Sequence, residues 1–336
     1  MKPFFKEPGG LEAKPDFSVV PPDFCRKIED LLQSPISSAL TARGGYSPAA
    51  GFILTLKNGR RIFAKGSHPG DVSHGTMNLR QEIAVYQNIP LLQDISPRYL
   101  GMAEDGDEDG WMLGFWQAVE NRKQALAADM IELLPRFEKV RELPALGTAA
   151  DHNYMRHFVT DEKKWQRVAE DEKIRRGLQP LFQDAGWLDK NLPKLISLQA
   201  RVPDVRKESC LVHGDLRTDN FIRGDRTYVI DWANACRGPL GLDAAFLFAH
   251  LEGMGQCRFE EAAETYRTAG GRASEETLLV FMASLSGYFA EQAWRAVPAG
   301  LPRLRWMQKT MLAGALSILG RLGTLDSPPI ILDSTG

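Results

Sequence analysis

Three side chains that could bind a metal ion and accept a proton lie close together in the second half of the chain. Asp215 and Asn220 are five positions apart, and Asp231 follows eleven positions later. Short β-prone runs at 211–212 and 228–230 lead into them, so the polar residues are expected at strand ends. Mg²⁺ prefers carboxylate and amide oxygens, and a carboxylate beside the ion can take a hydroxyl proton. The spacing indicates a magnesium site with a base, although turn chemistry alone also gathers Asp, Asn and Gly in loops.

The order of these residues resembles the catalytic and metal-binding loops of the aminoglycoside phosphotransferase and choline-kinase-like families, which have the protein-kinase-like fold. Those families carry H-G-D, four further residues and then Asn, as residues 213–220 do here. Their second metal motif is a short strand ending in I-D-W, which residues 230–232 match. Gly238-Pro239 and Asp243 match the closing pattern of the region. The joint match is far rarer by chance than HGDxxxxN alone.

The resemblance implies a role for four residues. Asp215 would orient and deprotonate the hydroxyl of the acceptor. Asn220 and Asp231 would hold Mg²⁺ against the nucleotide phosphates. Arg217 would act in catalysis by neutralising charge on the transferring phosphoryl group, an effect on the order of 10³-fold in related reactions. The alternative for Arg217 is an exposed salt bridge.

Two further residues of this segment are expected to support the loop and not to react. His213 is expected to pack and form a hydrogen bond that fixes the loop backbone. Asp243 is expected to hold the same loop.

The resemblance requires a phosphate-binding lysine on a strand and a carboxylate on the next helix, and the first half of the chain offers both. Asn58-Gly59 separates two extended runs and predicts a hairpin, because both turn positions must tolerate positive φ. Lys65 ends its second strand, and Glu82 lies on a predicted helix at 78–87. Their ion pair would direct Lys65 toward the α- and β-phosphates. Taken singly, each residue is better explained as a solvated charge than as a ligand, and only the match in the second half of the chain favours the functional interpretation.

A glycine-containing turn and an aromatic connector complete the implied nucleotide site. Gly44, Gly45 and Ser47 occupy the position of the turn that covers the nucleotide, where glycines let backbone amides approach phosphate oxygens. A plain β-turn explains them nearly as well. Trp116, in the connector 114–118, would line the adenine pocket or lie in the core.

The elements that must position these residues change in character along the chain. We expect an α+β, bilobal, protein-kinase-like fold. A small N-terminal lobe (1–117) would hold an antiparallel β-sheet and one helix, and a larger, mainly helical C-terminal lobe (118–336) would carry the catalytic and metal loops and the acceptor pocket. The predicted strands are 37–41, 52–57, 60–65, 98–103 and 111–117. The predicted helical stretches of the second lobe are 121–142, 160–177, 190–200, 258–268, 275–297 and 302–323.

Composition excludes several other classes of protein. The 336 residues have a formal net charge of −2, which gives no electrostatic footprint for nucleic acid or an anionic membrane. Four cysteines, far apart and without a CxxC pair, favour a reducing compartment over a disulfide framework. The N-terminus lacks the apolar stretch of a signal peptide, and no run predicts a membrane span. A cytoplasmic location is therefore expected.

The departures from protein kinases favour a small-molecule hydroxyl acceptor over a peptide substrate. Gly214 stands where regulated protein kinases carry an arginine that grips a phosphorylated activation loop. Only eleven residues separate Asp231 from Asp243, which leaves little room for a peptide-docking segment. Acidic residues at 252, 260 and 261 would suit a cationic acceptor, although such a cluster is usually a solvated helix surface.

Three functions remain as hypotheses. The first is a kinase that uses ATP or GTP with Mg²⁺ to phosphorylate a hydroxyl of a small metabolite or antibiotic. The second is a catalytically inactive nucleotide-binding module of the same fold, which the retention of Lys65, Asp215, Asn220 and Asp231 argues against. The third is a metal-dependent hydrolase that uses His213, for which a ligand motif such as HExxH is missing.

Overall fold

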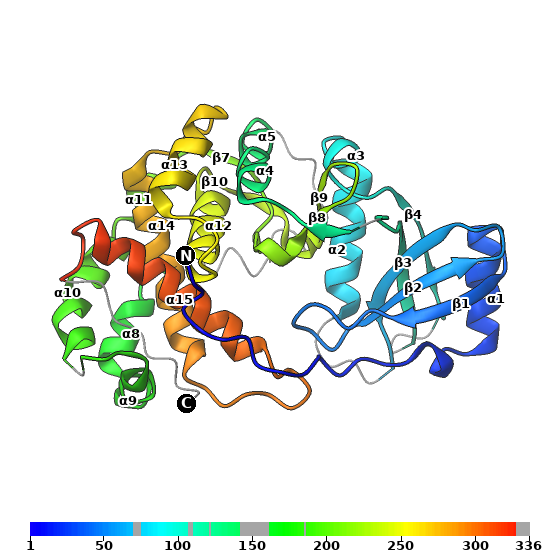
Figure 1. Ribbon diagram of the computed structural model, residues 1–336, viewed down its shortest axis with the longest axis horizontal. Helices are drawn as coiled ribbons and strands as arrows, with labels where there is room; N and C mark the ends of the chain where they lie inside the picture. The colour runs from blue at the N-terminus through cyan, green and yellow to red at the C-terminus, as the bar shows by residue number, and fades with distance from the viewer. Residues whose placement is uncertain (70–74, 107–109, 121, 142–160, 185, 327–336) are drawn as a thin grey trace.

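Five antiparallel strands form the N-terminal sheet, in the order β1-β2-β3-β5-β4 (Figure 1). The computed structural model describes residues 1–69, 75–106, 110–120, 122–141, 161–184 and 186–326. The strands are β1 (Ile36–Thr41), β2 (Ala50–Leu56), β3 (Arg61–Ser67), β4 (Tyr99–Glu104) and β5 (Met112–Gln117). Each predicted strand is confirmed with ends within two residues of those expected, and the predicted hairpin turns at Gly59, whose φ is +85°. The acidic turn expected between β4 and β5 includes residues 107–109, which lie outside the described residues.

Successive side chains of each strand point to opposite faces of the sheet, and each face packs against a different helix. Leu113 and Phe115 of β5 pack in a core with helix α1 (Pro22–Leu32), whereas Met112 and Trp116 pack with helix α2 (Gly75–Asn88). On β3, Ile62 and Ala64 join the first core, so the intervening residues face the side of α2. This alternation places Lys65 on the face that borders the helical part of the molecule.

Helix α1 is an element that the sequence analysis missed. Its residues Phe24, Ile28 and Leu32 recur at helical spacing and are buried against the sheet. Pro22 stands in the first turn, where its missing N–H removes no intrahelical bond. We expected one helix beside the sheet; α1 and α2 cover opposite faces, and the short helix α3 (Leu92–Ile95) follows α2.

The remaining described residues are mainly helical. The helices are α4 (Ala127–Ile131), α5 (Leu134–Glu138), α8 (Lys164–Glu170), α9 (Glu172–Leu178), α10 (Trp187–Gln199), α11 (Val202–Val205), α12 (Leu242–Gly253), α13 (Phe259–Thr268), α14 (Glu275–Ala293) and α15 (Leu304–Arg321). Short strands pair beside them: β7 (Ser209–Val212) with β10 (Cys236–Pro239), and β6 (Lys123–Gln124) and β9 (Thr227–Val229) on either side of β8 (Phe221–Arg223).

Helices α12, α14 and α15 form the centre of this region, and two of them cross closely. A Cβ atom on Gly314 of α15 would lie 1.9 Å from the carbonyl oxygen of Ala249 on α12. The crossing therefore requires glycine at this position. Every residue of α12 is buried, so its sequence lacks the polar face by which a helix is recognised, and the sequence analysis missed it.

Two long helical predictions are divided in the structure. The stretch 121–142 contains α4 and α5, with Pro135 in the first turn of α5, and the stretch 160–177 contains α8 and α9. Asp171 ends α8 and caps α9 by accepting hydrogen bonds from the backbone N–H groups of Lys173 and Ile174 at 2.8 and 3.3 Å. Residues 121, 142 and 160 of these predictions lie outside the described residues. Within the described part of the chain, no helix combines the length and apolar character needed to cross a membrane.

Candidate active site

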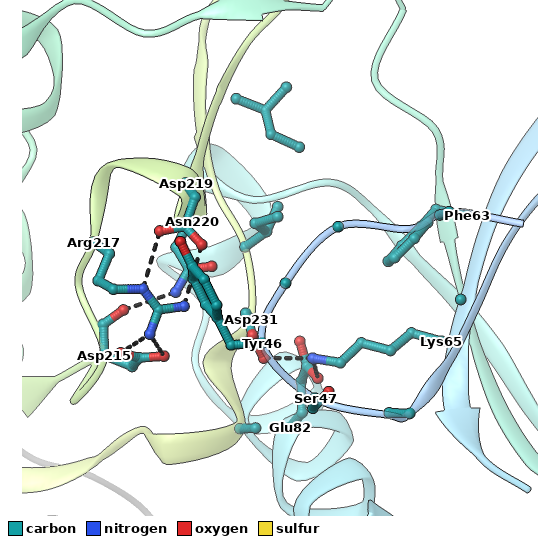
Figure 2. A pocket seen from close by; sticks show the side chains of 18 of the residues that line it. Tyr46, Ser47, Phe63, Lys65, Glu82, Asp215, Arg217, Asp219, Asn220 and Asp231 are labelled. Atoms are coloured by element: carbon teal, nitrogen blue, oxygen red, sulfur yellow. Dashed lines mark hydrogen bonds and ion pairs between the residues drawn. The ribbon is translucent and has the colours of Figure 1, made fainter. Parts of the chain in front are cut away.

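A cavity of about 810 Å³ lies between the sheet and the helical region. Its walls come from the turn at residues 44–47, β2, β3, α2, the loop at 214–220 and helices α12, α14 and α15. Figure 2 shows that Lys65 from the sheet extends across this space toward Asp231 and Glu82, with Arg217 and Asp215 on the opposite side. All of the site residues predicted from the sequence line the cavity.

Lys65 connects the sheet to both predicted carboxylates. Its Nζ lies 2.9 Å from Oε2 of Glu82 and forms a second ion pair with Asp231. Burial opposes the charge of Lys65, but the two carboxylates together raise its pKa above the ordinary value. Asp231 is partly buried, and although this desolvation acts to raise its pKa, Lys65 holds the pKa below the ordinary value. The predicted pair of Lys65 and Glu82 is therefore present, and Asp231, a predicted metal ligand, pairs with the same lysine.

Helix α2 is tied directly to the segment that follows Asp231. Glu82 is 3% exposed, and its Oε1 accepts a hydrogen bond from the backbone N–H of Trp232 at 3.2 Å. One residue earlier, the side chain of Gln81 donates to the carbonyl of Ala235 at 3.0 Å. The position of Lys65 is thus coupled to the metal loop through buried hydrogen bonds on one helix.

The loop that carries Asp215 is held by the two supporting residues expected from the sequence. Asp243 accepts hydrogen bonds from the backbone N–H groups of His213 and Gly214 at 2.6 and 3.0 Å. The ring of His213 bonds the carbonyl of Ile230 at 2.9 Å through Nε2, and its Nδ1 accepts from the N–H of Asp215 at 3.2 Å. Burial lowers the pKa of His213 to about 4, so the ring is neutral. Both supporting predictions are confirmed.

Arg217 is buried and forms ion pairs with two more accessible carboxylates of its own loop. Its Nη1 donates to both oxygens of Asp215 at 2.6 and 2.7 Å, and its Nε and Nη2 donate to Asp219 at 3.0 and 3.2 Å. The salt bridge considered as the alternative to a catalytic role is therefore present, although the arginine itself is 6% exposed. Burial raises the pKa of Asp215 to about 7 although Arg217 acts to lower it. A carboxylate with such a pKa is suited to accept a proton near neutral pH.

Asp231 and Asn220 approach the cavity from the ends of short strands. Asp231 has φ +67°, a left-handed conformation that is uncommon for a residue other than glycine and is often found at functional sites. The side-chain nitrogen of Asn220 donates to the backbone carbonyl of Asp215 at 2.7 Å, and the backbone carbonyl of Asn220 accepts from the N–H of Ile230 at 2.9 Å. The two predicted metal ligands therefore belong to one hydrogen-bonded unit with the predicted base.

The turn at residues 44–47 closes over this unit. Gly44, Gly45 and Ser47 line the cavity, and Gly45 has φ +82°, which favours glycine. Tyr46, which the sequence analysis did not single out, lies over the guanidinium of Arg217 with its ring centroid 4.8 Å away. The predicted turn is thus in direct contact with the loop of the predicted base.

Trp116 lies in the core and also borders the cavity. It is 3% exposed, and its ring centroid lies 5.6 Å from those of Tyr86 and Tyr99. It also lines the cavity, and its Nε1 has no hydrogen-bond partner among the described residues. The residue is part of the core below α2 and forms one wall of the site.

Other residues of the cavity were not identified from the sequence. They are Lys14, Tyr46, Asp219, His250 and Arg303. Asp219 lies two residues after Arg217, and this alternation of charges was a local signal that could have identified it. Tyr46 lies within the predicted turn at 44–47, whereas Lys14, His250 and Arg303 come from distant parts of the chain and no local pattern marks them.

The acidic residues considered for a cationic acceptor lie elsewhere. Glu252 is 1% exposed and bonds Arg321 at 2.8 and 3.1 Å, and Glu260 bonds the same arginine at 2.9 and 3.1 Å. Neither these residues nor Glu261 lines the cavity. The cluster therefore lies outside the cavity, and its two paired members hold α12 and α13 to the end of α15.

Comparison with known proteins gives a family match and a set of similar folds. Residues 39–278, more than half of the chain, match the phosphotransferase enzyme family. A search of curated proteins finds no match. Choline kinase LicA from Streptococcus pneumoniae is 16% identical, with 86% of this chain and 99% of that chain covered and a TM-score of 0.51.

Two antibiotic kinases have similar structures. Spectinomycin phosphotransferase APH(9)-Ia, in complex with ADP and spectinomycin, is 13% identical, with coverage of 85% and 93% and a TM-score of 0.54. The GDP complex of an aminoglycoside 2′-phosphotransferase-IIIa variant is 15% identical, with coverage of 89% and 96% and a TM-score of 0.53. At these identities the structures show a shared fold, which is the fold expected from the sequence.

Proposed function

The chain belongs to the phosphotransferase enzyme family, and we propose that it transfers the γ-phosphate of ATP to a hydroxyl group of a small molecule. The observation that carries this proposal is the pairing of Lys65 with Glu82 and Asp231 in the same cavity as Asp215. Phosphoryl transfer depends on positioning and charge neutralisation more than on covalent chemistry. The cavity brings together the groups that provide both.

The nucleotide would bind between the covering turn and the sheet. Lys65 would contact its phosphates, the amides of Gly44, Gly45 and Ser47 would approach them from above, and Trp116 would border the base. Two proteins with the same fold have structures in complex with ADP and GDP, which supports nucleotide binding by this chain. GTP remains the alternative donor.

Asn220 and Asp231 are the proposed ligands of Mg²⁺. Both present oxygen atoms at the cavity, and no group of three or more His, Cys, Asp or Glu suited to a metal ion occurs among the described residues. Two protein ligands are typical of Mg²⁺, which completes its shell with water and substrate phosphates. When bound, the ion would neutralise charge on those phosphates.

Asp215 is the proposed base and Arg217 its positioning partner. The two hydrogen bonds from Arg217 fix the orientation of the Asp215 carboxylate and stabilise its ionised form. The acceptor hydroxyl would donate its proton to Asp215 as the hydroxyl oxygen bonds the γ-phosphorus. The bond from that phosphorus to the β,γ-bridging oxygen would break in the same step, so that ADP leaves. Asp219 binds the Nε and Nη2 atoms of the same guanidinium and so holds Arg217 in this orientation.

The walls of the cavity favour an uncharged acceptor with an apolar body. Each of the five acidic lining residues (Glu7, Glu82, Asp215, Asp219 and Asp231) is already paired with an arginine or a lysine. A polycationic acceptor would therefore find no free carboxylate among the described residues. The wall formed by α12, α14 and the start of α15 is mostly aromatic or aliphatic, with Phe246, Tyr288, Phe289, Leu304, Trp306 and Met307.

His250 of α12 offers a hydrogen-bond donor in this apolar wall. Its Nδ1 accepts from the backbone N–H of Thr218 at 3.1 Å, and burial lowers its pKa to about 4, so the neutral ring carries its proton on Nε2. Nε2 is buried and has no partner among the described residues. An oxygen of the acceptor would satisfy this group, whose burial without a partner is costly.

Substitution of the proposed base tests the reaction. Asp215→Asn should reduce kcat by about 10²- to 10⁴-fold and leave ATP affinity nearly unchanged, because the amide cannot accept the proton but fills the same space. Asp225→Asn, in the exposed turn between β8 and β9, is the matched control. Full activity of the Asp215 variant would contradict the assignment.

A screen with radiolabelled ATP identifies the acceptor class. It should cover aminoglycosides, macrolides, choline-like amines, amino acids, sugars and uncharged hydroxylated apolar compounds. We expect the highest kcat/KM for an uncharged compound, and the highest value for a polycation would contradict that part of the proposal. ATP binding without transfer to any compound would instead favour the inactive module, and phosphate release from esters without ATP would favour the hydrolase.

The proposal also covers the partners and location of the protein. Little chain lies free between Asp231 and α12, because a 3₁₀ turn and β10 occupy it, so no peptide substrate is expected. The near-neutral net charge of −2 argues against a nucleic acid or membrane partner. All four cysteines are free thiols, which supports a reducing cytoplasm.

A further inference from the structure

The first sixteen residues form an extended arm that lies against the helical region before the chain enters the sheet. The backbone N–H of Phe4 donates to the carbonyl of Gly253 at 3.0 Å, and Trp306 Nε1 donates to the carbonyl of Phe5 at 3.3 Å. Phe5 is 4% exposed and belongs to the core of the helical region. Figure 1 shows the arm, in dark blue, running from the neighbourhood of α12 and α15 to α1 on the far side of the sheet.

A second attachment joins the arm to the covering turn. Arg303, just before α15, pairs with Glu12, which is fully buried, and with Glu7 at 3.1 Å. The same guanidinium donates to the carbonyl of Gly45 at 3.3 Å and lies 5.5 Å from the ring centroid of Tyr46. The arm is therefore fixed beside the turn that would cover the nucleotide.

This attachment directs Lys14 onto the face of the sheet that carries Lys65. Lys14 Nζ donates to the carbonyl of Ala49 at 3.1 Å and lies 3.9 Å from the position that a Cβ atom on Gly51 would take. Gly51 is the direct partner of Lys65 in the β2–β3 ladder. Because side chains of directly paired residues point to the same face, both ammonium groups lie on the cavity side of the sheet.

The two lysines differ in how their charge is balanced. Lys65 is paired with Glu82 and Asp231, whereas Lys14 forms no ion pair within the described part of the chain and has a carbonyl as its hydrogen-bond partner. Burial, and then the charge of Lys65, lower the pKa of Lys14 to about 8. A half-buried ammonium without a carboxylate therefore borders the space proposed for the phosphates, where an anion would stabilise it.

We propose that Lys14 binds the phosphate tail of the nucleotide, which makes the N-terminal arm part of the nucleotide site. This inference rests on the proposed function and adds a residue that lies outside the matched region, which begins at residue 39. ATP carries about four negative charges, and Lys65 is already neutralised by its two carboxylates, so Lys14 supplies a cation that Lys65 alone does not.

Nucleotide binding measured by titration calorimetry with the full chain and Mg²⁺ tests this proposal. Lys14→Gln should weaken ATP and ADP about 10- to 100-fold, the range for loss of a charge-assisted hydrogen bond, and change adenosine affinity by less than about twofold. Lys14→Arg should keep most of the affinity for ATP. Lys6→Gln, an exposed lysine on the same arm, is the matched control and should bind ATP as the wild type does.

Several results would overturn the proposal. The first is that Lys14→Gln binds ATP within about twofold of the wild type. The second is that this variant loses as much affinity for adenosine as for ATP. The third is that Lys6→Gln loses as much affinity for ATP as Lys14→Gln does. Lys14→Met, which keeps the apolar stem, provides a second variant if the glutamine variant fails to fold. If the wild type binds and uses ATP and the Lys14 variants bind ATP equally well, only the role of the arm is refuted, and the proposed function stands. Wild-type protein that does not bind ATP would refute the proposed function.

Discussion

Replacing Arg217 with glutamine should move the pH dependence of phosphate transfer to more alkaline pH. Arg217 donates two hydrogen bonds to the Asp215 carboxylate, at 2.6 and 2.7 Å, inside a buried site. Burial raises the pKa of Asp215 to about 7, and Arg217 is the strongest influence that opposes this rise. The base acts only when ionised, so activity should increase with pH through this pKa.

The magnitude follows from the charge that is removed. A neighbouring arginine lowers the pKa of a carboxyl group by about 1 to 3 units, so Arg217→Gln should place the pKa of Asp215 at about 8 to 10. At pH 7 the ionised fraction of the base would fall from about one half to between about 9% and about 0.1%, a loss of about 5- to 500-fold. The loss should diminish as the pH is raised, since alkali restores the carboxylate.

The assay is kcat/KM measured from about pH 6 to about pH 10 at constant ionic strength, with Mg²⁺, ATP and the acceptor found in the screen. Arg226→Gln, exposed in the turn between β8 and β9, is the control. An unchanged midpoint with a loss near 10³-fold at every pH would mean that Arg217 acts on the phosphoryl group and not on the base. An unchanged rate would refute both roles.

Three further predictions concern the framework of the site. Asp243→Asn should lower the free energy of unfolding, measured with urea, by about 1 to 3 kcal/mol, because Asp243 accepts hydrogen bonds from two N–H groups of the loop that carries Asp215. It should also lower kcat more than it changes KM, and an unchanged kcat would contradict this. Burial raises the pKa of Glu138 to about 7 from 4.5, so the wild type loses stability as the pH rises between these values. Glu138→Gln should not lose stability over this range, because glutamine does not titrate. The measurement is the melting temperature of both proteins at pH 5 and pH 8, and an equal difference between them at the two pH values would refute the argument. Gly314→Ala should cost about 1 to 3 kcal/mol, while Gly9→Ala, with no atom within 4 Å of its added Cβ, should be neutral in the same urea assay.

Much of the fold could be predicted because its signals are local. The Asn58-Gly59 turn, the alternation along the strands and the helical spacing in α2 each depend on a few neighbouring residues, and the structure places these elements as expected. Helix α12 was missed for a related reason. All of its residues are buried, so its sequence has no periodicity that a local pattern could show.

The sequence by itself determined the chemistry of the candidate site, because the motifs at 213–220 and 230–232 place their polar residues within short loops. Only the tertiary structure decided which charges meet. Lys65 and Asp231 are 166 positions apart, and Arg303 and Glu12 are 291 apart. Such pairs form only when the sheet, the helices and the N-terminal arm pack together. That packing is determined by the whole buried surface and not by the charged residues that it brings into contact.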